Sequence, residues 1–176
     1  MLARLSTLAI SFAALGLVAG FSQSAAAAPL IKSQSPCTPA PIACVAFTDQ
    51  GTIPIIRTVG LVAPSAGMAM VHFHGSATCE YSGADLGVVI FQSQIVDDPA
   101  ATPDSRSPGG LHQGVRMLPK SGTSNGRAPF NLSSTRTFII PKAGRTFFHF
   151  KIARVNMSPD TICGVHNATF SIVFIP

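Results

Sequence analysis

The chain has 176 residues, of which 47% are apolar and only 11% are charged, a composition that favours a packed core over intrinsic disorder. When Arg4 of the N-terminal export segment is left out, the twelve Lys and Arg become eleven. Against seven Asp and Glu this gives a net charge of +4. The basic residues occur singly along the chain, which argues against a nucleic-acid surface.

The first 27 residues have the pattern of a secretory signal peptide. Arg4 precedes an apolar run at residues 8–18, and small residues follow at 22–28. The run is shorter than the ~20 residues that a membrane-spanning helix needs, and no later segment is long enough. We therefore expect cleavage after Ala26 or Ala27 and a secreted or periplasmic protein without a transmembrane segment.

Residues 28–50 form a segment that contains Pro and Cys and leads into the first strand, and residues 51–176 are expected to form one β-sandwich domain. The four cysteines, Cys37, Cys44, Cys79 and Cys163, all lie beyond the signal. An even number of cysteines in an exported chain is typical of disulfides. Three pairings are possible, and we favour Cys37 with Cys44 and Cys79 with Cys163. A thiolate metal site is disfavoured, because no pair has the two-residue spacing of a zinc knuckle.

Alternation of apolar and polar residues with period two dominates after the signal, which predicts an all-β fold. Residues 97–130 are rich in Pro and Gly and are predicted to be loop, interrupted at most by one edge strand. Eight short strands joined by turns favour a jelly-roll-like antiparallel β-sandwich. The predicted strands are 43–48, 53–62, 68–76, 86–95, 114–118, 134–140, 146–155 and 167–175.

An internal repeat relates two parts of the chain at a constant offset of 77 residues. Residues 62–73 match residues 139–150, and the shared positions include a Pro-x-Ala-Gly unit and a His-Phe pair. Proline presets the first position of a turn and glycine accepts a left-handed conformation, so each unit predicts a hairpin loop. Two related hairpins, one in each half, are consistent with a jelly roll.

The alternation also predicts which side chains share a face. His72 and His74 lie two residues apart on one strand, about 6.6 Å from each other, with Met70 on the same stripe. Imidazole and thioether together favour copper in an exported protein. In the second copy Phe147 and His149 take the corresponding places, so the repeat alone gives His72 a structural counterpart.

A segment around these histidines resembles the first cupin motif. Gly67, His72, His74, Glu80 and Gly87 follow in that order, with Glu80 one or two positions later than in the cupin pattern. The resemblance implies a metal held by the two histidines and the glutamate inside a jelly roll.

Copper–zinc superoxide dismutase is a second family with partial similarity. The chain looks like it at His72-Phe-His74 followed by Cys79, at 144–146 and at 163–165. That family's bimetallic site takes six histidines and an aspartate, whereas this chain has five histidines. The resemblance therefore implies at most a copper-only site with His72, His74 and His149.

No Gly-x-Ser-x-Gly elbow and no paired carboxylates suited to glycoside hydrolysis occur, so we expect no catalytic site. The favoured function is binding of an extracellular or periplasmic ligand, or structural assembly, without a cofactor. The expected form is a homo-oligomer that packs a face bearing Met70 and Phe147. The alternative is a jelly roll that binds copper or another metal through His72 and His74, with Met70, His149 and Glu80 as candidate completing ligands.

Overall fold

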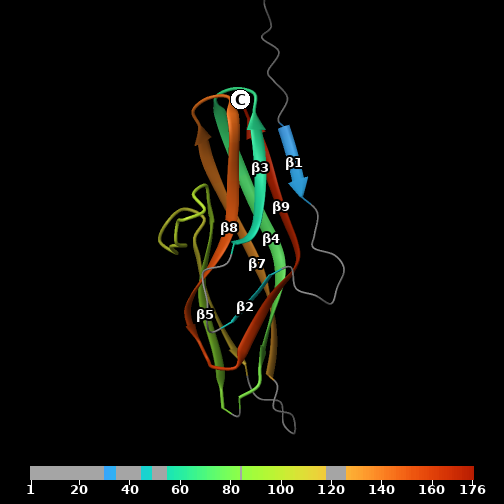
Figure 1. Ribbon diagram of the computed structural model, residues 1–176, viewed down its shortest axis with the longest axis vertical. Helices are drawn as coiled ribbons and strands as arrows, with labels where there is room; N and C mark the ends of the chain where they lie inside the picture. The colour runs from blue at the N-terminus through green and yellow to red at the C-terminus, as the bar shows by residue number, and fades with distance from the viewer. Residues whose placement is uncertain (1–29, 35–44, 49–54, 84, 118–125) are drawn as a thin grey trace, which may run out of the picture.

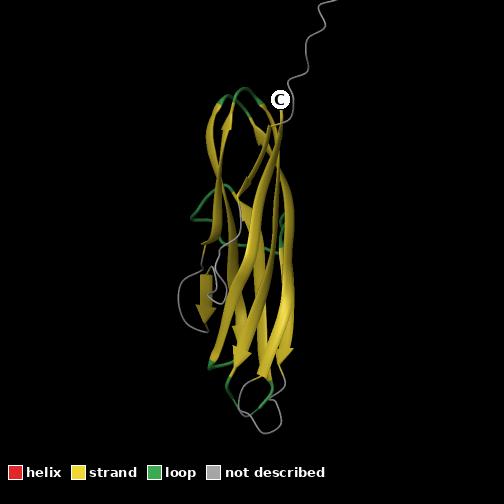
Figure 2. Cartoon of the chain, turned by 90° about the vertical axis from the view of Figure 1, so that its right-hand side faces the viewer, coloured by secondary structure: helices red, strands yellow, loops and turns green. Residues whose placement is uncertain are grey.

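Nine strands and no helix occur in the part of the chain that the computed structural model describes, which comprises residues 30–34, 45–48, 55–83, 85–117 and 126–176. The strands run along the length of an elongated sandwich, and loops gather mainly at its two ends (Figures 1 and 2). Their bounds are β1 Leu30–Gln34, β2 Val45–Thr48, β3 Ile55–Ala63, β4 Gly67–Tyr81, β5 Gly87–Val96, β6 Leu111–Met117, β7 Gly126–Ile140, β8 Gly144–Met157 and β9 Thr161–Ile175.

The strands form two antiparallel sheets. Sheet A has the order β1-β9-β4-β7, and β2 also pairs with β9. Sheet B has the order β3-β8-β5-β6. The pairings are nested, because β1 and β2 pair with β9, β3 with β8, β4 with β7 and β5 with β6. The chain is thus paired like one long hairpin that has been rolled up into two layers.

All-β structure is confirmed, and each predicted strand overlaps an observed one. Several strands are longer than predicted: β4 continues to Tyr81, and β7 begins at Gly126 inside the segment predicted to be loop. Pro129 does not stop β7, since this strand is the edge of sheet A in the described order. Strand β1, which pairs with the far side of β9, is not among the predicted strands.

The prediction of two related hairpins is wrong, although the repeat itself is reflected in the structure. The loop at 64–66 joins β3 of sheet B to β4 of sheet A, and the loop at 141–143 joins β7 of sheet A to β8 of sheet B. Both loops are therefore arches that cross from one sheet to the other. Pro-x-Ala-Gly reverses the chain in either case, and the turn sequence alone does not tell which sheet receives the next strand.

The two arches lie side by side at one end of the sandwich, here called the arch end (Figure 1, top). Val62 pairs with Arg145 in sheet B, and their repeat counterparts Ile139 and Met68 pair with each other in sheet A. The register thus obeys a local pseudo-two-fold symmetry that exchanges the two sheets. The sequence repeat is therefore also a repeat of structure, because the pseudo-two-fold rotation relates one arch and its two strands to the other arch and its two strands.

Apolar side chains from both sheets fill the space between them. Phe73 and its repeat counterpart Phe150 stack across this core, with ring centroids 3.6 Å apart and ring planes 8° apart, and Phe170 meets Phe73 edge-on. All three rings are fully buried. Burying an aromatic side chain contributes about 1.5–3 kcal/mol, and such contacts between rings add roughly 0.5–1.5 kcal/mol. The inward-facing residues of the repeat therefore hold the two layers together.

Candidate functional site

The predicted stripe of β4 lies on the outer face of sheet A. Met68, Met70, His72 and His74 are at least partly exposed, and the residues between them are buried, as the alternation requires. In register with the two methionines are Ile139 and Thr137 on β7, and Ile175 and Val173 on β9.

Four side chains make this surface apolar at the arch end. Ile139 is 82% exposed, Met68 49%, Ile175 47% and Met70 43%. Ile139, Met68 and Ile175 stand in one row across three strands, and Met70 begins the next row. We call these four residues the sheet A patch. Contiguous exposed apolar surface of this kind marks interaction sites in soluble proteins.

Both repeat histidines make the same hydrogen bond. His72 Nδ1 lies 2.8 Å from Thr135 Oγ1, and His149 Nδ1 lies 2.8 Å from Thr58 Oγ1. The two threonines are also 77 residues apart, so the pseudo-symmetry extends to complete His-Thr pairs. The His72–Thr135 pair joins β4 to β7 in sheet A, and the His149–Thr58 pair joins β8 to β3 in sheet B. In both pairs the histidine lies on the strand that follows one arch and the threonine on the strand that precedes the other. A structural role in aligning these strands accounts for the bond at both places.

The candidate metal ligands do not gather at one point. His72, His74 and Met70 share the outer face of sheet A, whereas His149 lies on the outer face of sheet B. Glu80 is six residues beyond His74 on β4, about 20 Å along the strand. Its carboxylate forms an exposed ion pair with Arg127, with Oε1 3.5 Å from Nε. Within the described residues no group of three or more His, Cys, Asp or Glu side chains is arranged to hold a metal ion.

Met70 and Phe147, expected on one face, also lie on opposite sides of the sandwich. Met70 belongs to sheet A and Phe147 to sheet B. The ring of Phe147 lies over Gly60, where an added Cβ would come within 3.0 Å of it, and the Arg145 guanidinium lies 5.8 Å from the ring centroid. The sheet B copy of the surface therefore carries a cation where the sheet A copy has Met68.

On sheet B the residues that correspond to His72 and His74 are His149 and Lys151, and both are covered. Their exposed fractions are only 8% and 4%. The segment 97–110 passes over them, and Lys151 Nζ donates hydrogen bonds of 2.6 Å to the carbonyl oxygens of Pro99 and Ala101. Figure 1 shows this segment beside β8 and β5.

Further hydrogen bonds fix the covering segment. Gln94 bonds the backbone at Asp104 and Pro108, and Ser134 Oγ donates to the Gly109 carbonyl. Within the segment, the Arg106 N–H and the Ser107 hydroxyl donate to the Asp104 carboxylate, and these bonds lower the pKa of that carboxyl. The segment is thus a structured cover and not a loose loop.

The electrostatic environment of His149 follows from this cover. Burial lowers the pKa of His149, the nearby Lys151 ammonium lowers it further, and the carboxylates of Asp98 and Asp97 partly oppose these effects. The buried imidazole is therefore kept neutral at physiological pH.

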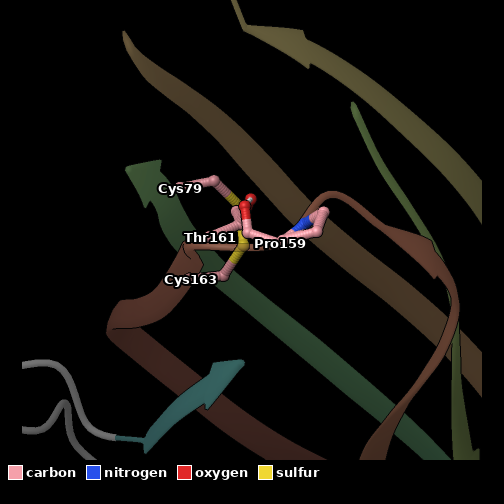
Figure 3. The surroundings of a disulfide bond; sticks show 4 residues. All are labelled: Cys79, Pro159, Thr161 and Cys163. Carbon is pink, nitrogen blue, oxygen red and sulfur yellow. Dashed lines mark hydrogen bonds between the residues drawn. A yellow bond between two sulfur atoms is a disulfide. The ribbon is translucent and has the colours of Figure 1, made fainter. Parts of the chain in front are cut away.

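The predicted disulfide between Cys79 and Cys163 is present. The two residues are register partners on β4 and β9, with Cα atoms 4.0 Å apart, and both are fully buried (Figure 3). The bond links two adjacent strands of sheet A at the end opposite the arches. Cys37 and Cys44 lie outside the described residues, so their predicted pairing is not described.

Part of the site could not be predicted from the sequence. Ile139 and Ile175 belong to strands that the alternation identified, but only the pairing of β4 with both β7 and β9 brings them beside Met68. The alternation places Lys151 on the outer face of its strand, and the apolar residues on that face predict a surface partly covered by the long Pro/Gly-rich loop or by another subunit. The hydrogen bonds from Lys151 to this loop confirm the first alternative but were not themselves predicted. The sequence feature that could have indicated an ordered cover is the content of Pro and Gly in 97–110, since these residues favour defined turns.

No protein-family model matches this sequence, and no curated protein matches it significantly. Among the described residues, no helix has the length and apolar character needed to cross a membrane.

Proposed function

We propose that the protein is an exported jelly-roll β-sandwich that acts by assembly, and that a second copy of the chain binds the outer face of sheet A through the sheet A patch. The nested strand order supports the jelly-roll assignment, because two four-strand antiparallel motifs wound together pair their strands in this way. The buried disulfide supports export, since such bonds persist in oxidising compartments.

The observation that carries the proposal is the difference between the two copies of the repeat. On sheet B the chain covers His149 and Lys151 with its own segment 97–110. On sheet A the described residues leave the equivalent His72 and His74, and the patch beside them, at least partly exposed. The outer face of the repeat is thus covered on sheet B and exposed on sheet A. This difference favours a partner that covers the face of sheet A.

A second copy is favoured over a charged partner by the chemistry of this face. From Met68 to Thr78 the outward side chains of β4 are Met, His, Ser and Thr, and the first Asp, Glu, Lys or Arg among them is Glu80. Two such faces can therefore meet without repulsion between like charges. The strands β9, β4 and β7 are each 15 residues long and together form a face on the order of 700 Å², close to the roughly 800 Å² that each partner contributes to a standard interface.

The test is the oligomeric state of the mature protein, measured by analytical ultracentrifugation over a range of micromolar concentrations. We expect a dimer that Ile139→Lys converts to a monomer, because burying an unpaired ammonium in the interface is costly. The matched control is Val62→Lys, since Val62 is the repeat counterpart of Ile139 and is 60% exposed on sheet B. This control should remain dimeric. A wild-type monomer throughout the range, or equal dissociation by both variants, would refute the proposal.

A second candidate is metal binding by His72 and His74. It is favoured by their common placement two residues apart on one outer face of β4, where both imidazoles are at least partly exposed. We expect about one equivalent of copper per wild-type chain after dialysis, and none in His74→Ala. Elemental analysis without a His-tag decides it, and metal-free wild type after incubation with copper contradicts it.

A further inference from the structure

A depression of about 390 Å³ lies on sheet B at the end opposite the arches. It is lined by Leu86, Val88, Ile90, Gly114, Val115 and Arg116. These residues belong to β5 with its preceding turn and to β6, which pairs with β5 and is the last strand in the sheet order. The depression is therefore remote from the sheet A patch and lies on the opposite layer of the sandwich.

Gly114 makes the depression possible. It stands opposite Ile90 on the edge strand, and a Cβ added there would meet only one atom within 4 Å, Ile90 Cγ1 at 3.9 Å. Glycine weakens a strand, and where it occurs in one it often marks the close approach of a ligand or another backbone. Gly114 has no positive φ and no crowding neighbour to explain it. Gly114 therefore leaves an open space above its Cα, which a larger side chain would fill.

The lining combines an apolar base with a single charge. Leu86, Val88 and Ile90 present aliphatic side chains, and Leu86 is 44% exposed to water. Arg116 is the register partner of Val88 and is the only charged residue of the lining. A guanidinium is suited to bidentate hydrogen bonding with a carboxylate. Concave sites of this volume that combine apolar walls with a small number of polar groups are typical of small-molecule sites.

We propose that this depression binds a small amphipathic carboxylate, with its acyl or aryl part over Gly114 and Ile90 and its carboxylate on Arg116. The site is separate from the assembly surface and does not depend on it. It gives the sandwich a ligand-binding function on its second layer.

The experiment is a titration of the full mature protein with octanoate, followed by amide chemical shifts, with octanol as the uncharged probe. Octanoate should saturate in the millimolar range or below, with the largest shifts at Val88, Ile90 and Gly114. Octanol should bind at least about tenfold more weakly, because a hydrogen bond to a charged group contributes about 1.5–3 kcal/mol. Equal binding of the two probes, shifts centred elsewhere, or no saturation would overturn the proposal.

Three variants and one control separate the contribution of Arg116 from that of the apolar base. Arg116→Gln should weaken octanoate about tenfold and leave octanol unchanged, whereas Arg145→Gln, which removes a charge at the arch end, should change neither. Gly114→Leu should abolish binding of both probes by filling the depression. Gly114→Ala should weaken both probes less than Gly114→Leu, because its Cβ would meet only Ile90 Cγ1, at an ordinary contact distance, so that no neighbour has to move. Retention of full octanoate affinity in both Gly114 variants would place the ligand elsewhere and refute the assignment.

Discussion

His149 and its repeat counterpart His72 show how one side chain acquires different properties in two places. Each forms a 2.8 Å hydrogen bond with a threonine hydroxyl, yet His149 is buried beside the Lys151 ammonium while His72 remains partly exposed. The difference arises from segment 97–110, which covers the sheet B copy, whereas no described segment covers the sheet A copy. At the residue scale, the environment and not the repeat determines the chemistry.

The lowered pKa of His149 predicts a loss of stability in acid. Above pH 6.5 the imidazole is neutral in both folded and unfolded states and contributes nothing to the pH dependence. Below pH 6.5 the unfolded chain takes up the proton first, so the free energy of unfolding falls as the pH decreases towards the pKa of the folded state. Urea unfolding between pH 7 and pH 5 should show a smaller loss in His149→Gln than in wild type. Equal losses in the two proteins would contradict this assignment.

Lys151 should be the main anchor of the covering segment. Lys151→Met keeps the length of the side chain but leaves the carbonyls of Pro99 and Ala101 without their donor, which should cost about 1–3 kcal/mol. The control is Lys142→Met, an exposed lysine in an arch, which should change the free energy of unfolding by less than about 0.5 kcal/mol. Chemical unfolding at pH 7.5 measures both, and similar small effects would show that the segment is held without Lys151.

At the scale of elements, the two arches use glycine at the same repeat position for different reasons. Gly144 has a φ of +150°, a conformation that L side chains rarely adopt, and an added Cβ would meet nothing within 4 Å. At Gly67 an added Cβ would clash with the backbone oxygen of Ile175. The sequence predicted a left-handed glycine in both turns, whereas only Gly144 has a positive φ.

This difference predicts distinct outcomes for two identical substitutions. Gly144→Ala should lower the free energy of unfolding by about 1–3 kcal/mol through backbone strain, with little change in neighbouring residues. Gly67→Ala should also destabilise, but by displacing the end of β9, so amide exchange should increase around Ile175. Hydrogen exchange compared with thermal unfolding distinguishes the two causes. Increased exchange around Ile175 in both variants would contradict the distinction.

The strands and the side-chain faces could be predicted from the sequence, because period-two alternation depends only on which residues are apolar. The predicted common face of His72 and His74 is the outer one, and Val71 and Phe73 between them are buried, as period-two alternation requires. The assignment of strands to sheets could not be predicted, since Pro-x-Ala-Gly reverses the chain equally well in a hairpin and in an arch. That one ambiguity misplaced His149 and Phe147 relative to Met70, because an arch turns the second copy of the repeat to the opposite outer face.

At the scale of the whole molecule, the disulfide secures the sheet at the end away from the arches. Cys79 and Cys163 are separated by 84 residues, so their bond removes much of the freedom of the unfolded chain. The double variant Cys79→Ala, Cys163→Ala, with Cys37 and Cys44 unchanged, should lose about 2–5 kcal/mol of unfolding free energy relative to the oxidised protein. Guanidinium unfolding measures this, and a loss below about 1 kcal/mol would show that sheet A does not depend on the cross-link.

The position of β4 has a consequence for how the protein is made. Both of its neighbours in sheet A, β7 and β9, come later in the chain, and β9 is the last strand described. During synthesis the centre of sheet A therefore has no native partner until the C-terminal third has been translated. Contacts this distant in sequence form slowly, on the scale of milliseconds to seconds in two-state β proteins. We therefore expect sheet A to form only after most of the chain has been translated, whereas β5 and β6, which pair within residues 87–117, can associate earlier.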